Sequence, residues 1–394
     1  MAAATSEIKV FYCYTHEDQE YRAQLEAHMA NLKRLYNLQT WFDRDILPGD
    51  QGEKVSESHL DSADLIFLLI SPAFMSSDYS YHTEMMRALK RHERGEARVI
   101  PVLVRSVHWD NAPFSTIHAL PSNSIPIARW PDPDDAFYDV VRGVERTIKS
   151  LLAAREAQTW LEKGDMLKDL KQYKEAVEAY DQAIRHNPDA ADAYYGKGYA
   201  LNNLKNYEQA MRAFEHAILL KPDFANAYNN KGIALHALKR YNDAIVAFNH
   251  AIRLDPNFAR AYYNKGVVLN EAKYHDEAIV AFDHAIRLDP HISRVYNNKG
   301  IALNELKRYD DALAALEHAI RLAPSFARAY YNKGNALYAL KRYDEAIPVF
   351  EHAILLDPNF ARAHYHKAVA LEKVGRYDEA QQAHARAREL GFRA

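Results

Sequence analysis

A motif of 34 residues is repeated end to end through the C-terminal part of this chain of 394 residues. A glycine recurs with that period at Gly164, Gly198, Gly232, Gly266, Gly300 and Gly334, and Ala368 takes its place in the last copy. Ladders of alanine and proline have the same period, and no copy contains an insertion. A single copy of this size cannot bury its apolar face alone, so the period predicts a solenoid of stacked units.

Each copy contains two amphipathic segments. The first holds the glycine, a short turn near Lys-Arg-Tyr follows, and the second holds the alanine and ends before the proline, which stops a helix. The sequence therefore predicts an all-α array of seven helix-turn-helix repeats over residues 157–394. The predicted copies are 157–190, 191–224, 225–258, 259–292, 293–326, 327–360 and 361–394.

This motif resembles the tetratricopeptide repeat (TPR). The residues that match its pattern in the first copy are Trp160, Gly164, Ala176, Tyr180, Ala183 and Pro188. The resemblance implies a superhelix whose inner groove binds an extended peptide or a helix of a partner protein. We therefore expect an unknown protein or peptide as the partner of the array.

An asparagine occupies the sixth position of the first helix in four successive copies, at Asn230, Asn264, Asn298 and Asn332. Asparagine is a poor residue for the middle of a helix. A primary amide can donate to one peptide carbonyl and accept from one peptide N–H. The ladder therefore indicates a groove that binds a peptide backbone, and duplication of a tolerated residue is the alternative interpretation.

Two further ladders carry basic side chains. Arginine stands at the second position of the same helix, at Arg260, Arg294, Arg328 and Arg362. These residues favour an acidic partner if they face the groove, and simple solvation is the alternative. Histidines recur at His216, His250, His284, His318 and His352. Stacked helices lie roughly 10 Å apart, whereas zinc needs nitrogen ligands at about 2 Å, so we expect packing or surface roles and no metal site.

Residues 7–155 follow a short tail, 1–6, and contain no repeat. Apolar segments at 8–14, 38–42, 63–70 and 98–104 alternate with amphipathic helical segments. This alternation predicts a flavodoxin-like α/β domain, with helices on both faces of a parallel sheet. Ligands of such sheets bind beyond the carboxyl ends of the strands. The fold class expected for the whole chain is therefore multidomain, α/β followed by all-α.

Three segments beyond those strand ends resemble the Toll/interleukin-1 receptor (TIR) domain. They are 11–18 (FYCYTHED), 41–49 (WFDRDILPG) and 71–84, where Ser-Pro-Ala-Phe precedes Ser-Asp-Tyr and Glu84. The resemblance covers about 150 residues and is similar to the bacterial branch of the family. It implies self-association of TIR domains and a role in bacterial immune signalling and antiphage defence.

The same resemblance implies hydrolysis of the nicotinamide–ribose bond of NAD+, with NAD+ as substrate and no cofactor. Glu84 matches the catalytic glutamate, whose carboxylate would stabilise an oxocarbenium-like ribosyl centre. The residues that match the substrate pocket are Tyr14, Asp43, Arg44, Ser71, Ser80 and Trp109. Ordinary packing is the alternative for the two aromatic residues, and solvation on a helix is the alternative for Glu84.

Two residues depart from the family pattern. Cys13 stands where serine is common, and we expect it to be a small buried side chain. Ser80 stands where relatives place cysteine or tryptophan, which would make the pocket less apolar and the reaction slow. Two other functions remain open: a non-catalytic TIR adaptor, and a peptide-binding scaffold with an incidental N-terminal domain.

Composition narrows the class of protein further. Residues 1–156 hold 17 Lys and Arg against 23 Asp and Glu, and residues 157–394 hold 33 against 30, so neither part has the basic excess of a nucleic-acid-binding protein. A single cysteine permits no intrachain disulfide. Neither a signal peptide nor an apolar run of membrane-spanning length occurs. We expect a cytoplasmic protein that binds neither nucleic acid nor membrane.

The junction between the two parts is rich in helix-forming residues. Between Gly143 and Gly164 there is neither proline nor glycine, so the last helix of the first domain is expected to continue into the first repeat. This continuity motivates the hypothesis of a sensor and effector in one chain. In this hypothesis the array binds a partner or its own copies, TIR domains come together, and the loop at 43–50 rearranges to complete the NAD+ site.

Overall fold

The structure is a computed structural model, and it describes residues 7–42 and 52–393. The chain divides into two compact units, Met1–Arg155 and Glu156–Ala394. Each unit is described by itself below.

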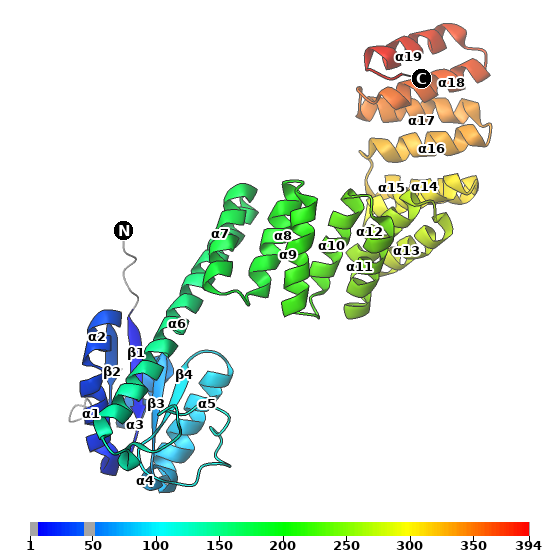
Figure 1. Cartoon of the computed structure of the whole chain (residues 1–394). Coiled ribbons are helices and arrows are strands. Elements are labelled where there is room, and N and C mark those ends of the chain that lie inside the picture. Colours follow the sequence, from blue (N-terminus) through cyan, green and yellow to red (C-terminus); the bar gives the residue numbers. More distant parts are fainter. Residues whose placement is uncertain (1–6, 43–51, 394) are drawn as a thin grey trace. The chain divides into compact units, whose positions relative to one another are not determined.

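The N-terminal unit is built on a sheet of four parallel strands. The strands are β1 (Ile8–Cys13), β2 (Leu38–Trp41), β3 (Leu65–Ile70) and β4 (Arg98–Leu103). Their order in the sheet is β2-β1-β3-β4, and all neighbours are parallel. The prediction of an open parallel sheet is confirmed, and the carboxyl ends of all four strands lie at one edge (Figure 1).

Helices and turns connect these strands. They are a 3-10 turn (His16–Asp18), α1 (Gln19–His28), α2 (Ala30–Tyr36), α3 (Gly52–Ser62), α4 (Pro72–Ser76), a π-helical segment (Asp78–Met85), α5 (Met86–Glu93), a 3-10 turn (Ile127–Arg129) and the first part of α6 (Pro133–Asp169). Helix α6 contains residues of both units, so the expected helix across the junction is confirmed.

Both faces of the sheet are buried, which explains why β3 is apolar at every position. On one face, Val10 and Phe67 pack with Phe137 of α6 and with side chains of α1 and α2. On the other face, Phe11 and Leu68 pack with residues of α3, α4 and α5. Successive side chains of a strand point to opposite faces, so each strand contributes to both layers.

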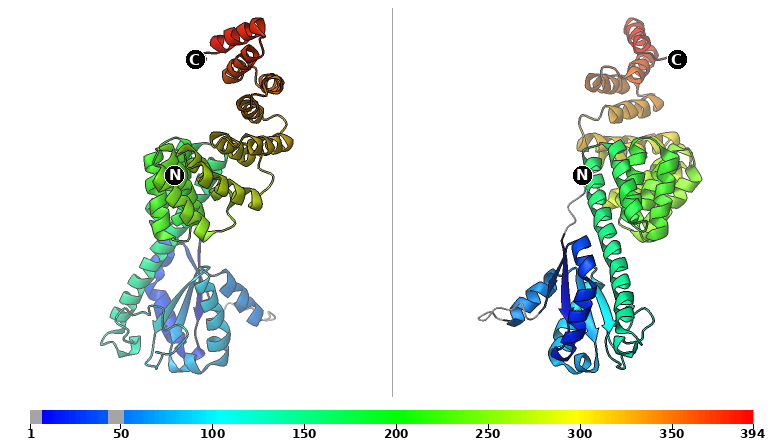
Figure 2. Two further views of the ribbon diagram at one scale, coloured as in Figure 1. Left: turned by 90° about the vertical axis from the view of Figure 1, so that its right-hand side faces the viewer. Right: turned by 60° about the vertical axis from the view of Figure 1, so that its left-hand side comes forward.

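The C-terminal unit is an array of helix pairs. After α6 its helices are α7 (Tyr173–His186), α8 (Ala191–Asn203), α9 (Tyr207–Leu220), α10 (Ala225–Ala237), α11 (Tyr241–Leu254), α12 (Ala259–Glu271), α13 (His275–Leu288), α14 (Ser293–Glu305), α15 (Tyr309–Leu322), α16 (Ala327–Ala339), α17 (Tyr343–Leu356), α18 (Ala361–Lys373) and α19 (Tyr377–Glu389). Consecutive helices lie side by side (Figures 1 and 2). The predicted run of helix-turn-helix repeats is confirmed.

The repeated glycine lets the two helices of a pair approach closely. A Cβ atom added at Gly266 in α12 would lie 2.6 Å from Cε1 of the buried ring of Phe282 in α13. That distance is far below van der Waals contact, so only glycine fits beneath the ring. The seventh repeat has Ala368 instead, together with His384, which contacts Glu372 (Nε2 to Oε1, 3.1 Å).

The turn within each repeat has left-handed backbone. Its key residue is a lysine with φ near +60° in six copies, for example φ 67° at Lys273, and Gly375 with φ 79° in the seventh. Left-handed backbone is strained for most side chains and costs glycine nothing. The turn at Lys-Arg-Tyr is therefore specified by helix-end hydrogen bonds, such as Tyr274 N to Leu269 O at 2.8 Å, rather than by a glycine.

We expect Gly266→Ala to destabilise the array by about 1–3 kcal/mol, because the added methyl group overpacks the interface with Phe282. Alanine gains only about 1 kcal/mol in helix propensity. Thermal and urea denaturation followed by far-ultraviolet circular dichroism measure the effect. The matched control combines Gly266→Ala with Phe282→His, the pair found in the seventh repeat, and should lose less than the two single changes together. An unchanged unfolding midpoint for Gly266→Ala would contradict this account.

Candidate functional site

A buried polar cluster lies at the carboxyl edge of the sheet. Asp18 follows β1, Ser71 follows β3, and Arg105 follows β4. The Asp18 side chain is completely buried. The hydroxyls of Thr15 (2.9 Å) and Ser71 both donate to its Oδ2, and Nε of Arg105 lies 3.6 Å from its Oδ1. The cluster thus ties three loops together around one carboxylate.

Ser71 also begins the next helix. Its Oγ accepts a hydrogen bond from the backbone N–H of Phe74 at 3.1 Å, which caps α4. Sequence reasoning named Ser71 but missed Asp18 and Arg105 as its partners. The available signal was the position of Asp18 within the first TIR-like segment, because a carboxylate just beyond a parallel strand end falls at the ligand edge.

Glu84 is the second buried carboxylate of this unit. It lies in the π-helical segment before α5, and only 6% of its surface is exposed to solvent. Its Oε1 accepts a hydrogen bond from Oγ of Ser56 in α3 at 2.9 Å, and Ser56 is also buried. The alternative interpretation of Glu84, a solvated charge on a helix, does not agree with this burial. Short π-helical segments occur frequently at functional sites.

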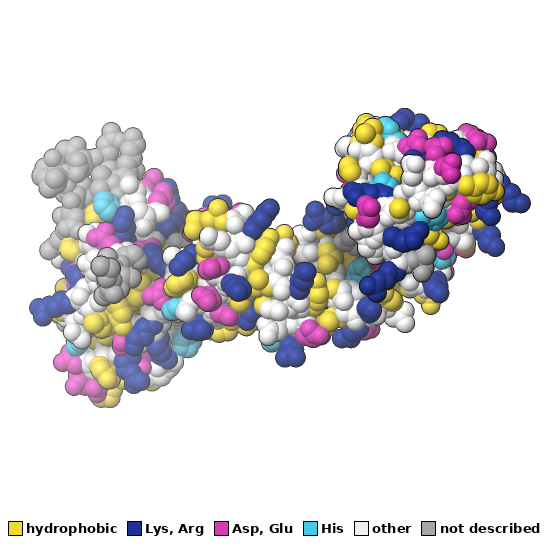
Figure 3. All heavy atoms as spheres, turned by 90° about the horizontal axis from the view of Figure 1, so that it is seen from above, with side chains coloured by type: hydrophobic (Ala, Val, Ile, Leu, Met, Phe, Trp, Pro, Cys, Tyr) yellow, Lys and Arg dark blue, Asp and Glu magenta, His cyan; other side chains and the backbone are white. Residues whose placement is uncertain are grey.

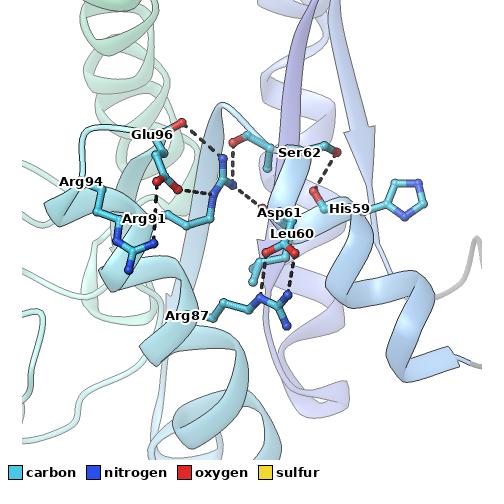
Figure 4. A network of polar contacts seen from close by, with 9 residues as sticks. His59, Leu60, Asp61, Ser62, Arg87, Arg91, Arg94 and Glu96 are labelled. Atoms are coloured by element: carbon cyan, nitrogen blue, oxygen red, sulfur yellow. Dashed lines mark hydrogen bonds and ion pairs between the residues drawn. The ribbon is translucent and has the colours of Figure 1, made fainter.

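A polar network connects α3 with α5 (Figure 4). It holds Ser56, on α3, close to Glu84, which lies just before α5. Arg87 of α5 donates to both carboxylate oxygens of Asp61 in α3, at 2.7 and 2.5 Å. Arg91 of α5 donates to the carbonyl oxygens of Leu60 and Ala63, the latter at 2.9 Å. A bidentate arginine gives geometric precision as well as attraction.

The other residues of the predicted substrate pocket are spread over the unit. Trp109 packs on the same face of the sheet as Met85, the neighbour of Glu84, and stacks on Phe114 with ring centroids 6.0 Å apart. Tyr14 is buried against the opposite face, near the guanidinium of Arg22. Asp43 and Arg44 lie outside the described residues. The backbone of Ser80 belongs to the π-helical segment, and its side chain is outside the description.

A cavity of 410 Å³ lies at the other end of β4 in this unit. His92, Arg98, His118 and Arg146 line it together with apolar residues such as Ile100. None of the predicted substrate residues is among its lining residues. The cavity is therefore separate from the contact between Ser56 and Glu84.

The asparagine ladder of the array joins successive repeats. Each amide donates a hydrogen bond through Nδ2 to the side chain at the fifth position of the first helix in the preceding copy. The pairs are Asn230 to Tyr195 Oη (2.9 Å), Asn264 to Asn229 Oδ1 (3.0 Å), Asn298 to Tyr263 Oη (3.1 Å) and Asn332 to Asn297 Oδ1 (2.9 Å). Nδ2 carries two hydrogens, so a donor remains on each amide.

The tyrosine partners keep their own donors. Burial raises the pKa of Tyr195 and of Tyr263, so both phenols are protonated at neutral pH. Each hydroxyl oxygen accepts from an asparagine of the ladder, which leaves its hydrogen able to donate to a ligand.

Two cavities adjoin this ladder. One, of 650 Å³, is lined by Tyr199, Asn230 and Arg260 from three successive first helices. The other, of 460 Å³, is lined by Asn297, Asn298, Ile301, Arg328, Tyr331, Asn332, Phe360 and Arg362. The position-two arginines are exposed, and three of them lie beside the asparagine ladder in these cavities. They therefore line the same surface as the amides.

The histidine ladder has a packing role. Each ring lies against a tyrosine of the first helix in its own repeat, with ring centroids 4.3–5.1 Å apart. The pairs are Tyr194 with His216, Tyr228 with His250, Tyr262 with His284, Tyr296 with His318 and Tyr330 with His352.

On the face of the molecule in Figure 3, Lys and Arg side chains are interspersed with Asp and Glu. Over the described residues, every helix is too short or too polar to cross a membrane.

Family models match both parts of the chain. The model of the TIR domain matches residues 10–137. Models of the tetratricopeptide repeat match residues 161–219, 225–258, 257–325, 327–360 and 349–382.

Individual relatives cover parts of the chain. The uncharacterised protein y4lF of Sinorhizobium fredii (strain NBRC 101917 / NGR234) is 43% identical over 135 residues, which are 34% of this chain and 42% of the relative. This chain thus spans less than half the length of that relative. A tetratricopeptide repeat protein from Parabacteroides merdae ATCC 43184 is 14% identical with a TM-score of 0.50, over 60% of this chain and 94% of its own.

A further solved structure is that of YrrB, described as a TPR protein with an unusual peptide-binding site. It is 24% identical with a TM-score of 0.42, over 48% of this chain and 96% of its own. Together with the parallel sheet and the helix pairs, the family matches show that this chain is a TIR-domain protein that carries an array of tetratricopeptide repeats.

Proposed function

We propose that the TIR domain hydrolyses NAD+ at the nicotinamide–ribose bond, with Glu84 as the catalytic residue. The observation that carries this proposal is the burial of the Glu84 carboxylate, at 6% exposure, against Ser56. Glutamate is rarely buried in proteins, because removing its charge from water is costly. A desolvated carboxylate interacts strongly with positive charge that develops beside it.

The reaction needs one stabilised cation and one nucleophile. The bond between ribose C1′ and the nicotinamide nitrogen breaks, its electron pair stays on nitrogen, and nicotinamide leaves as a neutral base. The ribosyl centre becomes oxocarbenium-like, and the Glu84 carboxylate stabilises it. Water then adds to C1′ and loses a proton, which gives ADP-ribose. The Ser56 hydroxyl orients the carboxylate by holding Oε1.

Different observations support roles for the other residues of the predicted substrate pocket. Trp109 shares a face of the sheet with Glu84's neighbour Met85, and we assign it to stacking on a ring of the substrate. Ser71 belongs to the edge cluster around Asp18 and would position the adjoining loops. For Tyr14, Asp43, Arg44 and Ser80 the support is the family resemblance alone.

We expect Glu84→Gln to lower the rate of nicotinamide release by about 100-fold or more, because the neutral amide cannot stabilise the cationic centre. The measurement is chromatography of NAD+, nicotinamide and ADP-ribose, with dilute and concentrated protein. The matched control is Glu93→Gln, an exposed glutamate at the end of α5, which should keep the wild-type rate. If wild-type protein releases no nicotinamide at any concentration, the adaptor function is correct instead.

We expect Ser56→Ala to lower kcat about fivefold with little change in KM, because it removes one hydrogen bond that orients Glu84, worth about 1 kcal/mol. Ser56→Thr keeps the hydroxyl and should restore most of the rate. Steady-state kinetics separate the two constants. Equal losses in the alanine and threonine variants would show that Ser56 acts through packing.

We further propose that the array binds a peptide with acidic side chains, and that this binding or self-association of the array brings TIR domains together. The support is the 460 Å³ cavity, where Arg328 and Arg362 lie beside the amides of Asn298 and Asn332. Amides would bind the peptide backbone, and guanidinium groups would bind carboxylates bidentately. Crowding of TIR domains then explains why activity should depend on protein concentration.

We expect peptides selected from a random displayed library against the full chain to be enriched in Asp and Glu. Changing Arg328 and Arg362 together to Gln should weaken the best peptide at least tenfold, because hydrogen bonds to charged groups contribute about 1.5–3 kcal/mol each. The affinity is measured by fluorescence anisotropy. The matched control changes Arg342 and Arg376, which pair with Glu345 and Glu379 (2.7 and 2.6 Å). Selection of peptides without acidic residues would contradict the proposal.

A further inference from the structure

A ladder of ion pairs connects neighbouring repeats of the array. In each pair, a lysine at the seventh position of a first helix donates to an acid on the second helix of the preceding copy. The pairs are Lys197 with Asp181 (2.6 Å), Lys231 with Glu215 (2.8 Å), Lys299 with Asp283 (2.6 Å), Lys333 with Glu317 (2.9 Å) and Lys367 with Glu351 (2.8 Å).

The ladder is interrupted between the third and fourth repeats. Lys265 occupies the lysine position there, but the acid position holds Asn249. Lys265 is partly buried, and within the described part of the chain it makes neither a hydrogen bond nor an ion pair. An ammonium group that loses water without gaining a partner is destabilised relative to the neutral amine. Accordingly, burial lowers the pKa of Lys265.

The residues around Lys265 do not replace the missing acid. His284, on the second helix of the same repeat, accepts a hydrogen bond through Nδ1 from Arg287 at 2.6 Å. Burial, Arg287 and Lys265 lower the pKa of His284 by more than Asp283 raises it, so its ring is neutral at pH 7. Asp283 itself is paired with Lys299 at 2.6 Å. Burial without an anionic partner therefore favours the uncharged, nucleophilic form of Lys265.

We propose that Lys265 is a site of N-acylation, with acyl thioesters or acyl phosphates as the acyl donors. The proposal rests on the missing carboxylate at Asn249, and it is independent of the TIR activity. Acylation would change the charge of the array at a single junction between repeats.

The chemistry is transfer of an acyl group to a neutral amine. The nitrogen lone pair attacks the carbonyl carbon, a C–N bond forms, and the bond from carbon to the thiolate or phosphate leaving group breaks. The nitrogen loses one proton, and the leaving group departs with the electron pair. No electron transfer occurs. Only the unprotonated amine is nucleophilic, so an ion pair that holds the proton protects a lysine from this reaction.

Acylated lysine is also less disruptive at the junction between the third and fourth repeats than at the junctions that have an ion pair. Acylation of Lys299, for example, would break its ion pair and leave Asp283 without its cation. At Lys265 the reaction removes a charge that has no partner. The new amide can exchange hydrogen bonds with the side-chain amide of Asn249, because both groups contain a donor and an acceptor.

The experiment compares the lysines of the ladder within one protein. Full-length protein is incubated with acetyl-coenzyme A or with acetyl phosphate, the remaining amines are labelled with deuterated acetic anhydride after unfolding, and mass spectrometry of peptides gives the acylated fraction at each lysine. We expect Lys265 to react about tenfold faster than Lys197, Lys231, Lys299, Lys333 and Lys367, because ion pairs hold the proton on those five amines. Comparison of the two reagents identifies the donor class.

Two reciprocal variants test the cause. Asn249→Asp completes the ladder and should slow Lys265 to the rate of its paired counterparts. Asp283→Asn breaks the next pair and should accelerate Lys299 by a similar factor. The proposal is overturned if Lys265 reacts within twofold of the paired lysines with both reagents. It is equally overturned if Lys265 reacts fast in the wild type and remains as fast in Asn249→Asp.

Discussion

The close contact between a glycine and a ring sets the geometry of the array. At Gly266 a Cβ atom would lie 2.6 Å from the ring of Phe282, and the equivalent glycines also meet a ring, except in the fifth copy, where Gly300 meets Leu316. Because it fixes the separation of the two helices in a pair, it also fixes where the next pair can stack. The ion pairs and asparagine bonds between repeats need this regularity, since each joins residues of different copies at 2.6–3.1 Å. The cavities beside the asparagine ladder thus depend on the packing inside each repeat.

The N-terminal unit, in contrast, buries two carboxylates, those of Asp18 and Glu84, away from water. Its parallel sheet is covered on both faces, so polar groups concentrate at the edge where the loops begin. Asp18 is held there by three loops, and Glu84 is held by the clamp between α3 and α5. Preorganisation of this kind gives electrostatic catalysis its strength, because the surrounding groups need not rearrange during the reaction.

The sequence was sufficient where a period or a family motif was present. It predicted the parallel sheet, the helix pairs and the helix across the junction. The catalytic role of Glu84 stays a prediction. The sequence could not predict that Tyr14 packs on the opposite face from Met85, because a residue at a strand end can turn to either side. Nor could it predict the partner of Glu84, since Ser56 lies 28 residues away in the sequence and tertiary contacts such as Arg87 with Asp61 bring α3 to it. The asparagine ladder was read as facing a ligand, yet half of its donors serve the neighbouring repeat, a competition visible only in three dimensions.

Because the array consists of repeats, the residue at each position can be compared with those at the equivalent positions of the other copies. Positions that stay the same, such as the glycine, maintain the stack. The informative positions are those where one copy departs without a compensating change nearby. His384 is compensated, since Ala368 replaces the glycine in the same repeat. Asn249 is not compensated, because Lys265 is retained opposite it. A partly buried cation kept without its anion costs free energy in the folded protein. Such a cost points to use of the amine itself, and the reciprocal exchange of Asn249 and Asp283 measures that use directly.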